Sequence, residues 1–198
     1  IFSDEIHSDL VFHGKKHTPT AMLSPEIAKF VVTGISGTKT FNMAGLQACT
    51  VVFPAKRFKA AFDAFWTGLD FLRNNAFSLT AMETAFTQGE EWLEQLLPYI
   101  SANFDFIHDY CRDHIPEIKP IVPDATYLVW LDCRELGLDN AQLRDFMIHE
   151  AHLGLNEGCS FGRSLTGYMR LNAACPRAVL QKALEQLRVA VDIRMNRK

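Results

Sequence analysis

Residues 30–42, FVVTGISGTKTFN, run from an apolar, β-branched stretch directly into a turn that contains Lys39. Most isolated lysines in turns are solvated surface charges, because an ammonium group is costly to bury. An amine in a partly desolvated pocket, however, loses its proton more easily and can condense with a carbonyl to form a Schiff base. The segment therefore predicts a strand followed by a candidate covalent site, provided that other parts of the chain supply partners for Lys39.

The composition is that of an ordinary soluble globular protein. The chain has 198 residues, of which 48% are hydrophobic and 22% charged, and its formal net charge is −3. A chain with this net charge has no excess of basic residues that would favour binding to nucleic acid or to an anionic membrane. No apolar run reaches the roughly 18 residues that a membrane span needs. The five cysteines are scattered without a CxxC pair, which favours reduced thiols. We therefore expect a cytoplasmic protein that binds neither nucleic acid nor membrane.

Three regions follow from the apolar patterns. Residues 1–55 alternate short apolar runs with loops, as in an α/β layer, and Ser24 followed by Pro25 marks a helix start. Residues 56–116 predict connecting helices, because apolar side chains up to Leu72, and again from Met82 onwards, recur every three or four positions. We expect Pro98 to kink or divide the second of these helices.

The third region, residues 117–198, predicts a small α+β domain. Strands are expected in residues 118–122, 125–133 and 167–175, and helices in residues 140–152 and 176–193. No metal site is expected, because His149 and His152 are three residues apart, whereas zinc-binding HExxH motifs need a spacing of four.

Three side chains outside the turn suit the chemistry of Lys39. Asp4 follows an apolar strand end, where a carboxylate can meet a protonated ring nitrogen, and His7 can hydrogen-bond a phenolic oxygen. Arg170 lies inside the apolar strand GYMRLNAAC, where a guanidinium requires an anion and its fork geometry suits a carboxylate. A structural ion pair is the alternative explanation for Arg170.

Together, SDEIHSDL, SGTKTFNMAGLQ, ATYLVWLDCREL and GYMRLNAACPR closely resemble the second half of the fold-type I pyridoxal-phosphate enzymes. Among these, the chain looks most like the MalY/PatB-type cystathionine β-lyases, which stand beside the class I and II aminotransferases. The resemblance implies an α/β fold, made of the C-terminal part of the large cofactor-binding α/β domain (1–55) and the small C-terminal α+β domain (117–198). The helices of residues 56–116 would connect the two.

The same resemblance implies roles for five residues. Lys39 would hold pyridoxal 5'-phosphate as a Schiff base, and Asp4 would pair with the pyridine nitrogen. His7 would lie near the ring oxygen, and Ser36 would touch the cofactor phosphate. Arg170 would bind the α-carboxylate of an amino-acid substrate.

The implied reaction is β-elimination from a cysteine thioether, which gives a thiol, pyruvate and ammonia, in a protein that is a homodimer when intact. An aminotransferase would use the same residues. Gln47 stands where many aminotransferases have a phosphate-binding arginine, which weakens that reading and is compatible with the lyase group. A non-catalytic sensor domain of a transcription regulator is a third reading. Because the family places its phosphate loop and stacking aromatic in the first half of the chain, we expect this chain to be a fragment that is inactive alone.

Overall fold

The computed structural model describes residues 1–71 and 74–196, which form two compact units, Ile1–Leu97 and Pro98–Lys198. Leu72, which belongs to the predicted apolar pattern, and residues 197 and 198 of the predicted third region lie outside the described residues. The predicted domain bounds at residues 55 and 116 stay predictions. The mixed α/β fold class predicted from the sequence is confirmed.

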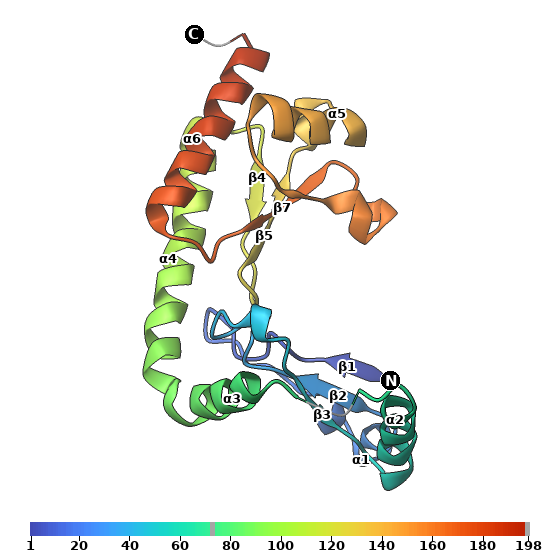
Figure 1. Ribbon diagram of the computed structural model, residues 1–198. Helices are drawn as coiled ribbons and strands as arrows, with labels where there is room; N and C mark the ends of the chain where they lie inside the picture. Colours follow the sequence, from blue (N-terminus) through green and yellow to red (C-terminus); the bar gives the residue numbers. More distant parts are fainter. Residues whose placement is uncertain (72–73, 197–198) are drawn as a thin grey trace. The chain divides into compact units, whose positions relative to one another are not determined.

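The first unit contains a three-stranded sheet of order β1-β2-β3 (Figure 1). Strand β1 (Phe2–Asp4) pairs in parallel with β2 (Val32–Ile35), and β3 (Thr50–Val52) pairs antiparallel with β2. The connection between β1 and β2 contains the 3-10 turn η1 (Thr20–Met22) and the short helix α1 (Pro25–Ala28). The predicted start of α1 is confirmed, because the Ser24 hydroxyl accepts the Ile27 N–H at 3.2 Å.

Helices follow the sheet, but their division differs from the expected one. Helix α2 (Lys56–Gly68) ends well before α3 (Ala76–Gln88), and Gly89 separates α3 from α4 (Glu90–His114). Helix α4 runs through Pro98 as one helix, so the predicted division there is wrong, while the predicted kink stays a prediction. Pro98 deprives the Glu94 carbonyl of its N–H partner, but both residues are exposed, so water can replace that hydrogen bond. Packing of Ile100 and Phe104, both fully buried, holds the helix together beyond the proline.

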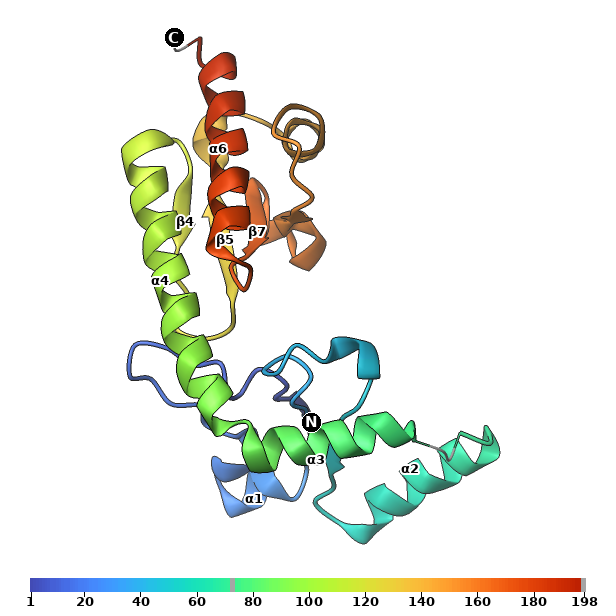
Figure 2. The same ribbon diagram turned by 60° about the vertical axis from the view of Figure 1, so that its left-hand side comes forward.

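The second unit has an antiparallel sheet of order β4-β5-β7-β6, made of β4 (Lys119–Ile121), β5 (Leu128–Asp132), β6 (Asn156–Glu157) and β7 (Tyr168–Asn172). Helix α6 (Arg177–Arg194) and the part of α4 after Pro98 lie on one face of this sheet (Figure 2). Met169 and Leu171 are buried on that face, so Tyr168 and Arg170 point to the other one.

The helix predicted over residues 140–152 is shorter and changes its winding. Helix α5 (Asn140–Asp145) begins with a capping box between Asp139 and Gln142, and a π-helical turn follows over Phe146–Glu150. Three short 3-10 turns, η3 (Arg134–Leu136), η5 (Gly158–Phe161) and η6 (Arg163–Leu165), complete the loops beside the sheet.

All five cysteines are free in the structure. Cys49, in the first unit, is exposed, whereas Cys111 on α4 and Cys133 after β5 are almost completely buried in the second unit. Burial raises the pKa of Cys111 to about 12 and raises the pKa of Cys133 as well. Neither buried thiol is reactive while the second unit stays folded.

Candidate active site

Lys39 lies in a turn fixed by hydrogen bonds at both ends. The Ser36 hydroxyl accepts the Thr38 N–H at 3.0 Å and lies 2.6 Å from the Ala48 carbonyl oxygen, to which it donates because a carbonyl can only accept. Beyond the lysine, the Met43 N–H donates to the Thr38 carbonyl at 2.8 Å. Lys39 is half-buried at the centre of this turn. Within residues 1–71 and 74–196 its amine has no hydrogen-bond or ion-pair partner.

Helix α3 and its end anchor the same turn from outside. The Ser78 hydroxyl donates to the Leu46 carbonyl at 2.6 Å, which fixes the chain after the lysine. The Phe41 ring packs edge-on against Phe86, with ring centroids 6.3 Å apart. It also lies against Gly89, where an added Cβ would come within 2.4 Å of the ring. The turn around Lys39 therefore depends on a glycine fifty positions further along the chain.

Asp4 comes to the same sheet edge as the lysine turn. Asp4 is paired with Gly34 in the parallel β1–β2 register, and carboxyl ends of neighbouring parallel strands meet at one edge. The Asp4 carboxylate is exposed and accepts the Ile6 N–H at 3.3 Å. His7 is half-buried in the turn that follows. The register thus places the end of β1 beside the start of the Lys39 turn, and the Thr40 hydroxyl, which donates to Asp9 at 2.9 Å, joins that turn to the segment after His7.

The sequence reasoning missed Glu5, which forms a buried polar cluster behind Asp4. Its carboxylate accepts hydrogen bonds from the Ser3 hydroxyl at 2.9 Å and the Thr20 N–H at 3.0 Å, and lies 2.9 Å from His17 Nε2. Burial would raise the pKa of Glu5, but the hydrogen bonds from His17, Thr20 and Ser3 outweigh it and lower that pKa. Strand alternation was the available signal, since Glu5 must face away from Asp4.

Arg170 is the central residue of β7 in the second unit, and it is not part of an ion pair with any described carboxylate. Its Nη2 donates to the Asn156 side-chain oxygen at 3.1 Å, and its guanidinium carbon lies 4.1 Å from the centre of the Phe161 ring. The alternative explanation, a structural ion pair, is therefore not found within the part of the chain that the structure describes.

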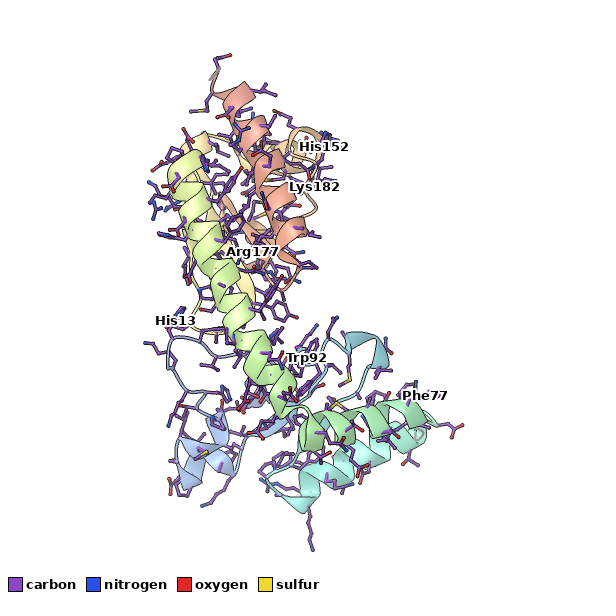
Figure 3. All side chains as sticks on the ribbon, turned by 90° about the vertical axis from the view of Figure 1, so that its left-hand side faces the viewer. His13, Phe77, Trp92, His152, Arg177 and Lys182 are labelled. Atoms are coloured by element: carbon purple, nitrogen blue, oxygen red, sulfur yellow. The ribbon has the colours of Figure 1, made fainter. Side chains whose placement is uncertain are left out.

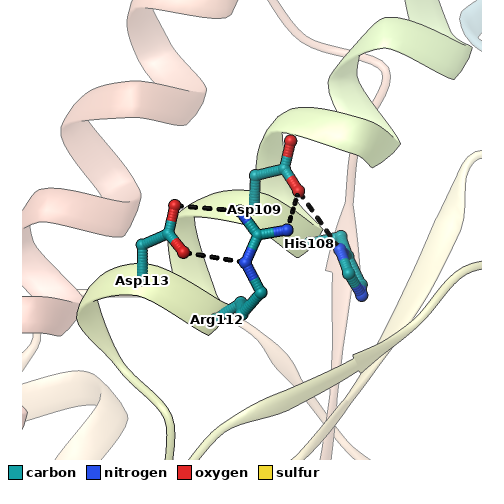
Figure 4. A network of polar contacts seen from close by, with 4 residues as sticks. All are labelled: His108, Asp109, Arg112 and Asp113. Carbon is teal, nitrogen blue, oxygen red and sulfur yellow. Dashed lines mark hydrogen bonds and ion pairs between the residues drawn. The ribbon is translucent and has the colours of Figure 1, made fainter.

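Two other surface features carry no comparable chemistry. An apolar groove of about 540 Å³ in the first unit is lined by side chains that include Phe77 and Trp92, both labelled in Figure 3, and none of its lining residues is titratable. On α4, Arg112 donates to Asp109 and Asp113, at 2.7 Å in each case (Figure 4). These side chains are exposed, so the ion pairs contribute little free energy and mark a solvated helix face.

Among the described residues, His, Cys, Asp and Glu side chains nowhere gather in a group of three that could hold a metal ion. Within the same residues, every helix is too short or too polar to cross a membrane.

Comparison with known proteins defines the class. The profile of the aminotransferase class I and II family matches residues 1–187, and the chain therefore belongs to this family. Cystathionine β-lyase PatB of Bacillus subtilis is 41% identical over 194 residues, which cover 97% of this chain and 50% of PatB. The chain thus spans about half the length of the curated relatives that it matches.

Two solved structures share the fold closely. Cystalysin from Treponema denticola, which contains pyridoxal 5'-phosphate, has a TM-score of 0.93 and 30% identity, covering 97% of this chain and 49% of cystalysin. A pyridoxal-phosphate-bound protein from Clostridium difficile 630, described as an aminotransferase, has a TM-score of 0.93 and 42% identity, covering 96% of this chain and 49% of that protein.

Proposed function

We propose that the full-length protein is a pyridoxal-phosphate-dependent carbon–sulfur β-lyase. The observation that carries the proposal is the meeting of the Lys39 turn with Asp4 at the carboxyl edge of the parallel strands β1 and β2. The identity with PatB, whose name states cystathionine β-lyase activity, supports the lyase reaction in particular.

The residues at this edge fit the cofactor by their chemistry. A primary amine, a carboxylate and an imidazole are the groups that a pyridoxal aldehyde, a protonated ring nitrogen and a phenolic oxygen require, and Lys39, Asp4 and His7 supply them. Ser36 would contact the phosphate. That contact stays a prediction, because a phosphate oxygen would compete with the Ala48 carbonyl for one hydroxyl proton.

When bound, pyridoxal phosphate supplies an electron-accepting ring that stabilises negative charge developing at the substrate Cα. Lys39 Nζ would hold the cofactor, and as a free amine it would accept the proton from the substrate Cα. Asp4 would favour a protonated ring nitrogen by hydrogen bonding. Arg170 binds the substrate carboxylate and so orients the Cα–H bond. The net reaction converts a cysteine thioether and water into a thiol, pyruvate and ammonia.

Transamination is the second candidate, and the 42% identity with a protein described as an aminotransferase favours it. The two reactions differ in whether they need a keto acid to accept the amino group. A lyase releases pyruvate and thiol from a cysteine thioether without any keto acid, whereas an aminotransferase turns over only when a keto acid is supplied.

The experiment is borohydride reduction of the full-length protein with pyridoxal phosphate, followed by peptide mapping and a pyruvate assay. We expect the label on Lys39 and pyruvate release without a keto acid. A label on another lysine would refute the assignment of Lys39 as the cofactor-binding lysine. Turnover that needs a keto acid and releases no pyruvate would show an aminotransferase and not a lyase. The same proposal includes a cytoplasmic homodimer for the full-length protein. Sedimentation of the purified protein tests the dimer, and fractionation of its cells tests the location.

A further inference from the structure

The sheet of the second unit places two side chains directly opposite Arg170. Asn156 on β6 and Trp130 on β5 are its register partners on either side of β7. Residues directly opposite each other in antiparallel strands project from the same face. All three side chains therefore lie on the sheet face away from the one that buries Met169 and Leu171.

Phe161 completes this group from the 3-10 turn η5. Its ring lies under the Arg170 guanidinium at 4.1 Å, within the range of a favourable cation–π contact. The ring is itself held by Trp130, which meets it edge-on at 5.5 Å and an interplanar angle of 83°. Phe161 is 49% exposed, so its contacts with Arg170 and Trp130 are what hold the ring beside the guanidinium.

One nitrogen of the Arg170 guanidinium has a hydrogen-bond partner, and another has none among the described residues. Nη2 is bound to the Asn156 side-chain oxygen at 3.1 Å. Nε is shielded from water and has no acceptor among the described residues. Because Nε is shielded, an incoming carboxylate would meet the guanidinium at its outer nitrogens, Nη1 and Nη2.

We infer that Phe161 and Asn156 are positioning residues, which hold the Arg170 guanidinium ready for the carboxylate of the substrate. The inference rests on the carboxylate-binding role proposed above for Arg170. An unrestrained arginine side chain loses conformational entropy when it binds an anion. Before the substrate arrives, Phe161 restricts the plane of the guanidinium and Asn156 holds one of its nitrogens. The side chain therefore loses less conformational entropy on binding.

The test measures binding of alanine and alaninamide by calorimetry to the full-length, cofactor-loaded protein. Alanine has the carboxylate and no thiol leaving group, and alaninamide lacks the charge that Arg170 would recognise. We expect Phe161→Leu and Asn156→Ala each to weaken alanine binding about fivefold and to leave alaninamide binding within about twofold. The KM for a cysteine thioether should rise by a similar factor with little change in kcat. Phe161→Tyr keeps the ring and should restore the preference for alanine.

Phe106→Leu is the matched control, because Phe106 lies under another arginine, Arg177, at 4.5 Å, on the helical side of the sheet. It should leave the ratio of the two affinities unchanged. Asn156 is exposed on a two-residue edge strand, so Asn156→Ala should fold even where Phe161→Leu does not.

Equal weakening of both ligands, or no change in either, would overturn the positioning role. Failure of the unmutated protein to bind pyridoxal phosphate would overturn the proposed function instead. Cofactor binding and thiol release together with an unaltered preference for alanine in both variants would overturn only the present inference.

Discussion

At Gly89, one added methyl group would reach the segment that contains Lys39. A Cβ there would lie 2.4 Å from the Ala85 carbonyl oxygen and 2.4 Å from the Phe41 ring, so the ring and the helix end must shift. We expect Gly89→Ala to lower the unfolding free energy by about 1–3 kcal/mol, the usual cost of overpacking. Urea unfolding measures this loss. Slower borohydride labelling of Lys39 would report the displaced turn.

Gly68 provides the matched control at the residue scale. It ends α2, and an added Cβ would meet nothing within 4 Å. Gly68→Ala should therefore leave stability unchanged or raise it by up to about 1 kcal/mol through better helix propensity. Equal losses in the two alanine variants would contradict the contact argument at Gly89.

Among the elements, the end of β1 depends on the buried Glu5 cluster. Glu5→Gln replaces one acceptor oxygen by a donor that faces Ser3, Thr20 or His17, and we expect a loss of about 1–3 kcal/mol near neutral pH. The folded-state pKa of Glu5 lies below its ordinary value of 4.5. Its contribution is therefore complete above pH 4.5 and is lost as the pH falls through the lower, folded-state pKa.

Thermal unfolding of both proteins over a range of pH checks this sign. The difference between Glu5→Gln and the unmutated protein should narrow as the pH falls below 4.5. Glu83→Gln is the control, since Glu83 is exposed on α3 and should change little at any pH. A difference that widens in acid would mean that Glu5 is destabilising when ionised.

Most elements could be predicted from local patterns, because their side chains repeat with the period of the structure they form. Strand β5 alternates buried and half-buried residues, and α6 buries Leu180, Leu184 and Leu187 on one side. Strand β6 has only two residues and exists through its pairing with β7, so no local signal marks it. Likewise, Pro98 has a strong local preference that the packing of Ile100 and Phe104 overrides.

The candidate site divides in the same way. Lys39, Asp4 and Arg170 could be proposed because each lies in a short, recognisable segment next to a strand. The groups that support them could not, because Gly89 meets Phe41, and Phe161 meets Arg170, only after the chain has folded. The mutual placement of Lys39 and Arg170 stays a prediction.

Across the whole molecule, buried apolar residues are unevenly shared. The second unit contains most of the large side chains with less than 2% exposure, among them Phe104, Ile107, Leu131, Met147 and Leu180. The first unit contributes Leu10 to that set, while Phe65, Phe71 and Phe77 are more than 60% exposed. Hydrophobic burial is the main favourable contribution to folding, so the two units should differ in independent stability.

We therefore expect residues 98–198 to fold cooperatively when expressed alone, and residues 1–97 to associate or stay largely unfolded. The larger fragment would begin with Pro98, which suits the first position of a helix. Circular dichroism melting and sedimentation of each fragment measure the outcome. A cooperative, monomeric 1–97 fragment would show that the exposed aromatic side chains do not limit its folding.

The different burial of the cysteines has a kinetic consequence. Alkylating reagents attack accessible thiolates, so Cys49 should be modified at once, whereas Cys111 and Cys133 should wait for the second unit to open. Mass spectrometry at successive times would resolve these sites. Comparing the modification rate of Cys49 with those of Cys111 and Cys133 would then report the equilibrium between the closed and the open second unit in the intact molecule, without any engineered probe.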